Sequence, residues 1–472
     1  MINHFNALFI RIRLPKYHKR PDEQSHMKWI LLSLISFVSL GNSSAQDTLT
    51  LKLQDAWDSA MKNNREIVIS KLDEQRASAQ FDQTKAAFLP QINLSYTAAA
   101  TNNPLNAFAF KLQQESISPN DFDPRMLNNP TSTQNFMTKV EWKQPLLNLD
   151  MLYQRRAADQ QLDVGYYNTE RTKEYVLFEV QKAYAQLQLS HQANQVMEEA
   201  LRTVNSISEN SKNYFEQGYL QKSDLLAVQV QVASTETRLA EAKSNVRNAS
   251  DYIGLLMGVK EGPIYSAEQL KIVSQPENIE TQVPENRADF KALNSTLRAQ
   301  EIMINSSKAS RLPKLNAFAD YMVNDKTAFG FGSNSYLVGA QLSWTLFNGT
   351  ATHYRTAEQK IAHSRIQQQI RYQHEQSQLE LNKTIRQLRD EEFSLRHYET
   401  SVSQAAEALR ILQNRFHQGL ASIADVLRSQ STLSEQKLLL AETVFKYNTT
   451  IAYLQFLTSN SDNNFNRYDH SF

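Results

Sequence analysis

The stretch that decides the fold is Phe215-Glu216-Gln217-Gly218-Tyr219-Leu220-Gln221-Lys222-Ser223-Asp224-Leu225-Leu226, and it returns in the second half of the chain as Phe416-His417-Gln418-Gly419-Leu420-Ala421-Ser422-Ile423-Ala424-Asp425-Val426-Leu427. The Phe, Gln, Gly, Asp and final Leu stand at the same positions in both copies. Because the flanks are helical in pattern, the simplest role of each Gly is to end a helix in the left-handed conformation. Ser422 stands three residues before an acidic residue, the spacing of a helix N-cap. Each copy therefore predicts the tip of a helical hairpin.

The flanks of both tips predict very long helices. No proline lies between Pro145 and Pro263, and none follows Pro313. We expect the helices to run over about 151–217, 223–257, 350–418 and 422–457. The first would be about 100 Å long at 1.5 Å per residue. A 3.5-residue apolar repeat precedes the second tip and predicts supercoiling of paired helices: Leu395, Tyr398, Val402, Ala405, Leu409, Leu412, Phe416.

Four segments alternate as strands do: about 91–98, 136–143, 314–322 and 336–346. In the first, Ile92, Leu94 and Tyr96 share one face and polar residues the other. In the second, Lys139, Glu141 and Lys143 share one face, and the large apolar residues Phe136, Val140 and Trp142 share the opposite face. Such strands suit a barrel with a wet lumen in lipid, and alternation also allows a sheet on a soluble core. Residues 101–135 are predicted to be a loop.

The N-terminal region has the pattern of an export signal. Met27-Lys28-Trp29 precedes an apolar run over 30–40 and then Ser43-Ser44-Ala45. We predict a signal peptide over 1–45, with a possible N-terminal extension before Met27. Removing its six basic and two acidic residues from 50 and 49 leaves 44 and 47, a net charge of −3. Such a chain has no electrostatic reason to bind nucleic acid.

The remaining chain divides into two structural repeats. The first, 46–258, reads as helix, strand, loop, strand and long helical hairpin, and the second, 287–458, repeats this order. Residues 259–286, with three prolines, form the predicted linker. Residues 459–472 are polar and predicted to be a disordered tail.

Over about 49–457 the chain resembles the TolC family of outer-membrane efflux proteins. The resemblance is carried by an ordered set of short motifs: Leu49-Thr50-Leu51, Ala56, Asn63-Asn64, Phe88-Leu89-Pro90, Gln144-Pro145-Leu146-Leu147, Arg287-Ala288-Asp289-Phe290, Leu312-Pro313, Leu346-Phe347-Asn348-Gly349 and the run from Gly419 to Leu427. Each motif is weak alone, and their repetition in the same order after a signal peptide is strong.

The resemblance implies a mainly α protein with a transmembrane β part. Each chain would give four strands to a trimeric 12-stranded outer-membrane β-barrel, which a long α-helical coiled-coil barrel continues across the periplasm. The homotrimer would be a passive exit duct of a tripartite efflux or type I secretion system. Its partners would be a periplasmic adaptor (membrane-fusion) protein, an inner-membrane RND or ABC pump, and outer-membrane lipid. Small molecules and proteins both remain open as cargo.

The resemblance also assigns roles to the tips. Gly218, Tyr219 and Leu220 would contact the adaptor, together with Gly419, Leu420, Ala421 and Ser422. Asp425 would point into the periplasmic gate, where copies from three chains form an acidic ring.

Two neighbours complete the expected gate. Asp224 stands at the position equivalent to Asp425 in the first tip. Arg428 stands one turn beyond Asp425, where an i,i+3 ion pair would neutralise the ring. The competing interpretation of Asp425 is a first-turn acid that stabilises its own helix.

The sequence offers no enzymatic motif. The ten histidines are scattered, and there is no His-Glu-x-x-His, no Gly-x-Ser-x-Gly and no phosphate-binding glycine loop. With no cysteine in the chain, thiolate metal sites are excluded. We therefore predict no catalytic residue, cofactor or metal site. The alternative function is a soluble periplasmic coiled-coil scaffold protein without channel activity.

Overall fold

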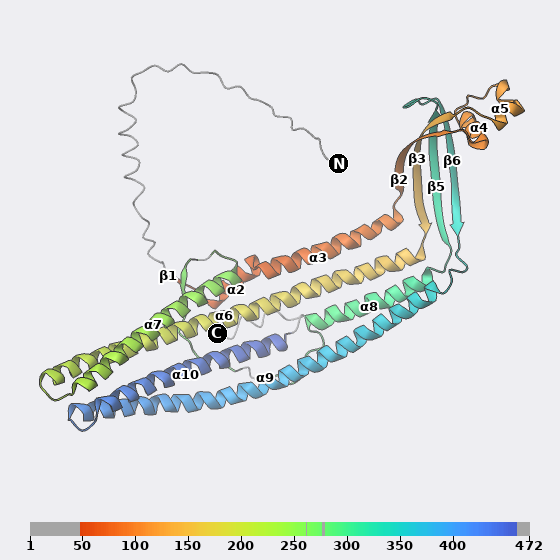
Figure 1. Cartoon of the computed structure of the whole chain (residues 1–472). Helices are drawn as coiled ribbons and strands as arrows, with labels where there is room; N and C mark the ends of the chain where they lie inside the picture. The colour runs from red at the N-terminus through yellow and green to blue at the C-terminus, as the bar shows by residue number, and fades with distance from the viewer. Residues whose placement is uncertain (1–47, 261, 276–278, 460–472) are drawn as a thin grey trace, which may run out of the picture. The chain divides into compact units, whose positions relative to one another are not determined.

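The computed structural model describes residues 48–260, 262–275 and 279–459 (Figure 1). The predicted signal peptide and nearly all of the predicted tail lie outside the described residues. The first elements are β1 (Thr48–Thr50), α2 (Leu53–Asn63), α3 (Arg65–Gln83) and the 3-10 helix η1 (Thr84–Phe88). Asn64 separates the two helices because its Oδ1 accepts the N–H groups of Glu66 and Ile67, which caps α3.

The four predicted strands are confirmed as one antiparallel sheet. They are β2 (Gln91–Thr101), β3 (Thr133–Leu147), β5 (Lys314–Asp325) and β6 (Ser333–Ser343), in the order β2-β3-β5-β6. The sequence prediction ended β2 and β5 three residues early and β3 four residues early, began β3 and β6 three residues late, and carried β6 three residues too far. Residues 133–135 and 333–335 are polar, so the apolar alternation that marks a half-buried strand is absent where the backbone pairing begins.

The prediction of a plain loop over 101–135 is wrong. This segment contains α4 (Pro104–Gln113), the 3-10 helix η2 (Pro119–Phe122) and α5 (Pro124–Asn128). Asn103 caps α4 and Asp123 caps α5, each through its side-chain oxygen, and proline occupies the first helical position in both. The segment is rich in Asn, Pro, Ser and Thr, a composition typical of loops, although proline after a capping residue also starts a helix.

The four long helices are present where the sequence predicted them. They are α6 (Leu149–Glu216, 68 residues), α7 (Lys222–Met257, 36 residues), α9 (Ala351–His417, 67 residues) and α10 (Ile423–Leu457, 35 residues). A shorter helix, α8 (Ala288–Ala309), lies between α6 and α9. Helix α6 packs against α3, α7, α8 and α10, and α9 packs against α8 and α10 (Figure 1).

The core consists of several apolar clusters along the helices. The predicted seam packs inward, with Leu395 and Leu409 buried and its other members half-buried. Leu395 lies with Leu388 against Val444, Tyr447 and Ile451 of α10. Another cluster surrounds Trp57 where α2, α6 and α7 meet. Beside that cluster, β4 (Ile264–Ser266) pairs in parallel with β1. Three-residue strands are too short to be recognised by alternation, so the sequence did not predict this pair.

Candidate functional site at the hairpin tips

Both tip glycines end their helices in the predicted left-handed conformation, with φ of 78° at Gly218 and 74° at Gly419. After Gly218, the N–H of Tyr219 donates to the carbonyl of Tyr214 at 2.8 Å. The second tip repeats the bond, from Leu420 to Arg415, at 2.8 Å. This is the Schellman arrangement, which requires a residue that tolerates positive φ. The sequence repeat is therefore a structural repeat of two identical helix ends.

The tips differ in what they expose. Tyr219 is 80% exposed and Leu420 is 63% exposed, whereas Leu220 packs into the core that the two hairpins share. Ala421 is half-buried. The buried members of that shared core come from α6, α7, α9 and α10: Ile207, Val228, Leu409, Ile423, Val426, Leu427 and Leu433. Each tip thus presents one large apolar side chain on a rigid turn.

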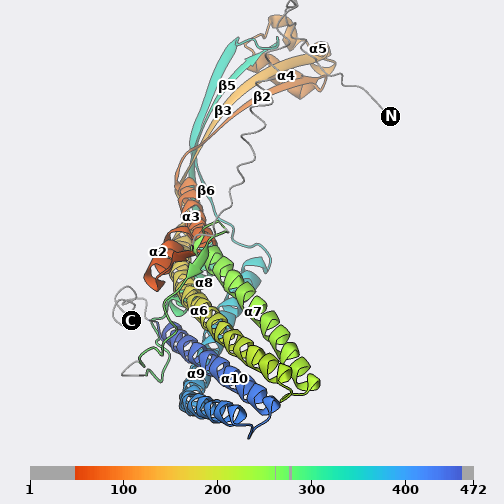
Figure 2. The same ribbon diagram turned by 90° about the vertical axis from the view of Figure 1, so that its left-hand side faces the viewer.

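The two hairpins are joined close to their tips (Figure 2). The Tyr214 hydroxyl lies 3.3 Å from Nδ1 of His417, and the Tyr214 ring meets the edge of Phe416 with centroids 5.6 Å apart. Further along, Gln231 donates to Ser431 at 3.2 Å. A crevice of about 400 Å³ lies between α6 and the second hairpin, lined by residues that include Asn210 and His417.

Asp425 lies in the first turn of α10, and Ser422 caps that turn. The Ser422 Oγ accepts the N–H of Asp425 at 3.2 Å and donates to its Oδ2 at 2.7 Å. The Ser422 hydrogen bond is the largest cause of a lowered pKa at Asp425. Arg428 contributes to this shift through space, but no ion pair within 4 Å joins it to Asp425 in the described chain. Asp425 therefore bonds to its helix cap, Ser422, in place of the predicted i,i+3 ion pair with Arg428.

Asp224 occupies the equivalent first-turn position in α7. The turn before it differs, because Gln221 makes no side-chain cap there. Asp224 and Asp425 stand at the starts of two neighbouring helices. Each carboxylate therefore lies near the positive end of its own helix dipole, which stabilises the negative charge.

The sheet has one charged face and one apolar face. On the charged face, the Lys139 Nζ lies 2.8 Å from Oδ2 of Asp320 and 3.4 Å from Glu141, and Lys143 lies 3.0 Å from Glu141. On the other face, Leu94 is 73% exposed and carries no polar contact. A protein surface rarely leaves such an apolar face in water.

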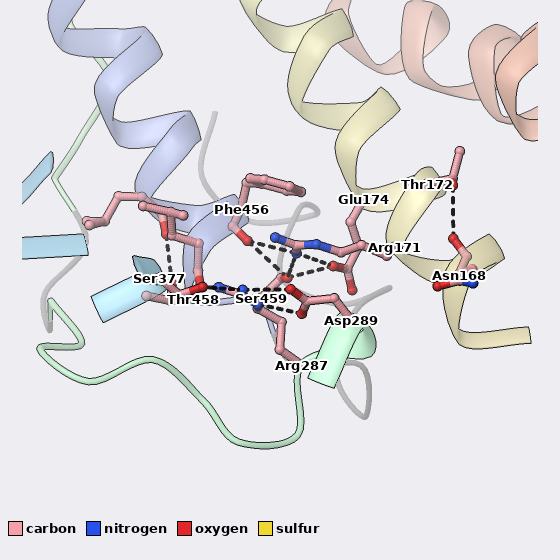
Figure 3. Close-up of polar contacts among 12 residues, drawn as sticks. Asn168, Arg171, Thr172, Glu174, Arg287, Asp289, Ser377, Phe456, Thr458 and Ser459 are labelled. Atoms are coloured by element: carbon pink, nitrogen blue, oxygen red, sulfur yellow. Dashed lines mark hydrogen bonds and ion pairs between the residues drawn. The ribbon is translucent and has the colours of Figure 1, made fainter. Parts of the chain in front are cut away.

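Two arginines join the end of α10 to α6 and α8 (Figure 3). The guanidinium of Arg171 donates to Glu174, to the Phe456 carbonyl and to Ser459 at 2.7, 3.2 and 3.0 Å. It also stacks on the Phe456 ring, 3.7 Å from its centroid. Since cations are favoured at a helix C-terminus, Arg171 holds the last turn of α10 in place.

Arg287 is the second member of this cluster and only 2% exposed. It donates twice to Asp289 at 2.7 Å, to the Leu457 carbonyl at 3.2 Å and to Ser377 at 2.8 Å. Burial opposes ionisation of Asp289, but the hydrogen bonds of Arg287 outweigh it and lower its pKa. The sequence marked Arg287 and Asp289 only as part of a motif. No local signal marked Arg171, because its partners are distant in the chain.

In the described part of the chain, no group of three or more His, Asp or Glu side chains is placed to bind a metal ion. None of the described helices combines the length and apolar character needed to cross a membrane.

Comparison with known proteins identifies the family. The profile of the outer membrane efflux protein family matches residues 56–259 and 281–459. No curated protein sequence matches the chain. Among solved structures, CusC matches with a TM-score of 0.73 at 16% identity over 89% of this chain and 96% of the other. VceC, an outer membrane protein of Vibrio cholerae, matches with a TM-score of 0.70 at 16% identity over 86% and 96%.

The outer membrane channel CmeC of Campylobacter jejuni matches with a TM-score of 0.72 at 14% identity, covering 95% of this chain and 93% of CmeC. At these identities the likenesses establish the fold, and the profile match over most of the chain establishes the relationship. The protein therefore belongs to the outer membrane efflux protein family, whose members are passive outer-membrane channels and not enzymes.

Proposed function

We propose that three copies of this chain form the exit duct of a tripartite efflux or type I secretion system. The observation that carries the proposal is the sheet. It has four strands and two unpaired edges, β2 and β6, and its exposed apolar face lies opposite the ion pairs of Lys139. Four strands are too few to close around a channel, and open edges do not persist in lipid. Pairing β6 of one copy with β2 of the next satisfies both constraints.

In this assembly the charged faces of three sheets line the lumen. The two cations of β3 are paired with Glu141 and Asp320, so the charges on the lumen wall largely cancel. Such a wall lets hydrated solutes pass without holding them, as conduction requires. The duct is passive, and an inner-membrane RND or ABC pump supplies the energy.

The tips are the proposed periplasmic gate and docking site. Asp425 and Asp224 lie in the first turns of α10 and α7, beside the turns that expose Tyr219 and Leu420, and Arg428 lies one turn further along α10. Gly218 and Gly419 form the turns that expose Tyr219 and Leu420. Leu220, Ala421 and Ser422 hold these turns in place. An exposed aromatic and an exposed leucine are suitable anchors for the helical hairpin of an adaptor protein.

Single-channel recording in planar bilayers tests the duct. We expect purified protein to migrate as a trimer and to give small openings whose cation preference falls in Asp425→Ala. Asp390→Ala, a change at an exposed acid within α9, is the matched control. Absence of any conductance from stable trimers would refute the proposal.

Adaptor docking has a separate test. The chain has no cysteine, so a photo-reactive maleimide attached at Tyr219→Cys or Leu420→Cys reports only that site. We expect both to cross-link to a periplasmic adaptor in cells. Leu379→Cys, 65% exposed in the middle of α9, is the control and should not cross-link. Equal cross-linking at all three positions would argue against docking at the tips.

A further inference from the structure

The segment between β2 and β3 is a folded unit. The edge of Phe122 meets the ring of Phe108 on α4 at 5.8 Å, and Lys111 pairs with Asp121 at 2.5 Å. The hydrogen bond from Lys111 lowers the pKa of Asp121 to about 2. These contacts tie η2 to α4, and α5 packs on both, so the segment 104–128 keeps its shape at the loop end of the sheet.

This unit is seated on the charged face of the sheet. At the loop end, Asn135, Asn324 and Ser333 are only 3%, 2% and 4% exposed. By strand register they share the face of Lys139, since Ser333 pairs with Asn324 and Asn135 stands two residues from Met137, the partner of Asn324. On the opposite face at the same end, Tyr96 remains 43% exposed. The segment 104–128 therefore covers the charged face of the sheet at this end and leaves the opposite face uncovered by it.

The contacts that seat the unit come from the C-terminal end of α4. Gln114 donates to the Gln134 carbonyl at 2.7 Å and to Oδ1 of Asn135 at 3.0 Å. Asn135 in turn donates to Asn324 at 2.9 Å, and the Ser333 hydroxyl donates to the Gln113 carbonyl. Through these bonds the end of α4 reaches β3, β5 and β6.

The α4 segment thus links the two edges of the sheet. It follows β2, which is one edge strand, and its last residue bonds to β6, which is the other edge. Its 10 residues span about 15 Å. Four strands spaced about 4.8 Å apart are about 14 Å wide. The helix therefore has the length needed to bridge the charged face from edge to edge.

We propose that α4 is a size filter at the loop end of the duct, seated by Gln113 and Gln114 on Asn135 and Ser333. The inference rests on the proposed trimeric duct, in which the charged face lines the lumen. Three copies of α4 would then cross the lumen wall at one level and narrow it. Leu105 and Leu112 lie seven residues apart on one side of α4 and are 77% and 53% exposed. They are placed to meet the α4 helices of the other two copies.

The test uses a single cysteine below the filter. Ser95→Cys places a thiol on the charged face of β2, opposite Lys139 in the strand register. Whole cells are treated from outside with maleimides carrying polyethylene glycol chains of increasing length. A second variant also replaces residues 103–131 by a seven-residue turn like 326–332, the connection that already joins β5 to β6. Phe331→Cys, 69% exposed in that connection, is the control site.

We expect short reagents to label Ser95→Cys in both backgrounds. The longest reagents should label it at least an order of magnitude faster when the segment is removed, while labelling of Phe331→Cys stays unchanged. The double variant Gln114→Ala, Ser333→Ala keeps the helix but removes the side-chain hydrogen bonds that hold it on the sheet. It should give an intermediate rate of labelling by the longest reagents. Asn129→Ala, a change at an exposed residue of the same segment, should leave the rate unchanged.

Equal labelling by the longest reagents with and without the segment would overturn the filter. The same proteins are recorded in planar bilayers, so failure of the duct itself is recognised separately by absence of conductance. If the shortened variant does not reach the membrane, the Gln114 and Ser333 substitutions decide the question, because wild-type labelling rates in that pair would refute seating by these residues.

Discussion

The hydroxyl of Tyr214, near the end of α6, lies 3.3 Å from Nδ1 of His417, the last residue of α9. This contact joins the two hairpins of one chain within a turn of their tips. The neighbouring rings of Tyr214 and Phe416 meet edge to face, so the junction has a polar and an apolar part. Any separation of the two tips must break both.

Tyr214→Phe should loosen this junction without unfolding it, because the ring contact with Phe416 remains. A neutral hydrogen bond contributes about 0.5–1.5 kcal/mol, which corresponds to a roughly 2- to 12-fold change in the equilibrium between joined and separated tips. We expect open-channel probability in planar bilayers to rise by this factor. Tyr372→Phe, which removes the acceptor of Gln376 on an exposed part of α9, is the control. Equal effects of both changes would show that the junction does not restrain the tips.

Gly419→Ala should destabilise the second tip. At φ of 74° an added Cβ is strained although nothing lies within 4 Å of it. The expected cost is about 1–2 kcal/mol. Gly165→Ala is the informative comparison, since Gly165 lies within α6 and its added Cβ would make ordinary contacts with Glu74 and Ala77. That change should stabilise the protein by about 0.5–1 kcal/mol. Denaturant unfolding of both variants checks the opposite signs.

Arg287→Met should be strongly destabilising. It leaves Asp289 without its bidentate partner and removes the donor to the Leu457 carbonyl at the end of α10. Breaking a buried ion pair typically costs about 3–5 kcal/mol. Lys383→Met, in the exposed pair with Glu380, should cost less than about 1 kcal/mol. Similar unfolding midpoints for both variants would contradict the structural role of the buried arginine.

The same cluster predicts a component of acid sensitivity. The pKa of Asp289 is lowered below its ordinary value of 3.8 in the folded protein. Its contribution to stability is therefore present above that value and is lost as pH falls through the lower folded pKa. Asp289→Asn should flatten the pH dependence of the unfolding free energy below about pH 4. Asp73→Asn, in an exposed pair with Arg76, is the matched control.

Ser422→Ala tests the electrostatics of the tip. Loss of the N-cap should cost about 1 kcal/mol. The pKa of Asp425 should rise towards its ordinary value, because the Ser422 hydrogen bond is the largest cause of its lowering. If Asp425 sets cation preference in the gate, the pH at which that preference is lost should move upward. Ser403→Ala on the exposed side of α9 is the control, and an unchanged midpoint in Ser422→Ala would exclude Asp425 from the gate.

Elements with a local signal were predictable. The helix ends at Gly218 and Gly419 follow from the rarity of positive φ outside glycine, and the Ser422 cap follows from its spacing to Asp425. The strands followed from a period of two residues. The α4 helix was missed because an Asn-Pro pair starts either a turn or a helix, and its contacts with Asn135 and Ser333 come from other strands.

Two polar residues of α10 show what only the packing decides. The packing of α10 on α6 places the Nζ of Lys437 2.7 Å from a carboxylate oxygen of Glu199. The structure buries Gln430, whose side-chain amide donates to Ser434. A periodic pattern reports the side of a helix that is covered, and it carries no information about which helix covers it.

By itself, the sequence determined the long helices, the two glycine-ended tips, the alternating strands and their repetition, because each depends on residues that are neighbours along the chain. The tertiary structure alone decided the junction of Tyr214 with His417, the burial of Arg171 and Arg287 at the end of α10, and the seat of α4 across the sheet. These contacts join residues far apart in sequence, and their free energy depends on how helices and strands pack rather than on any local period.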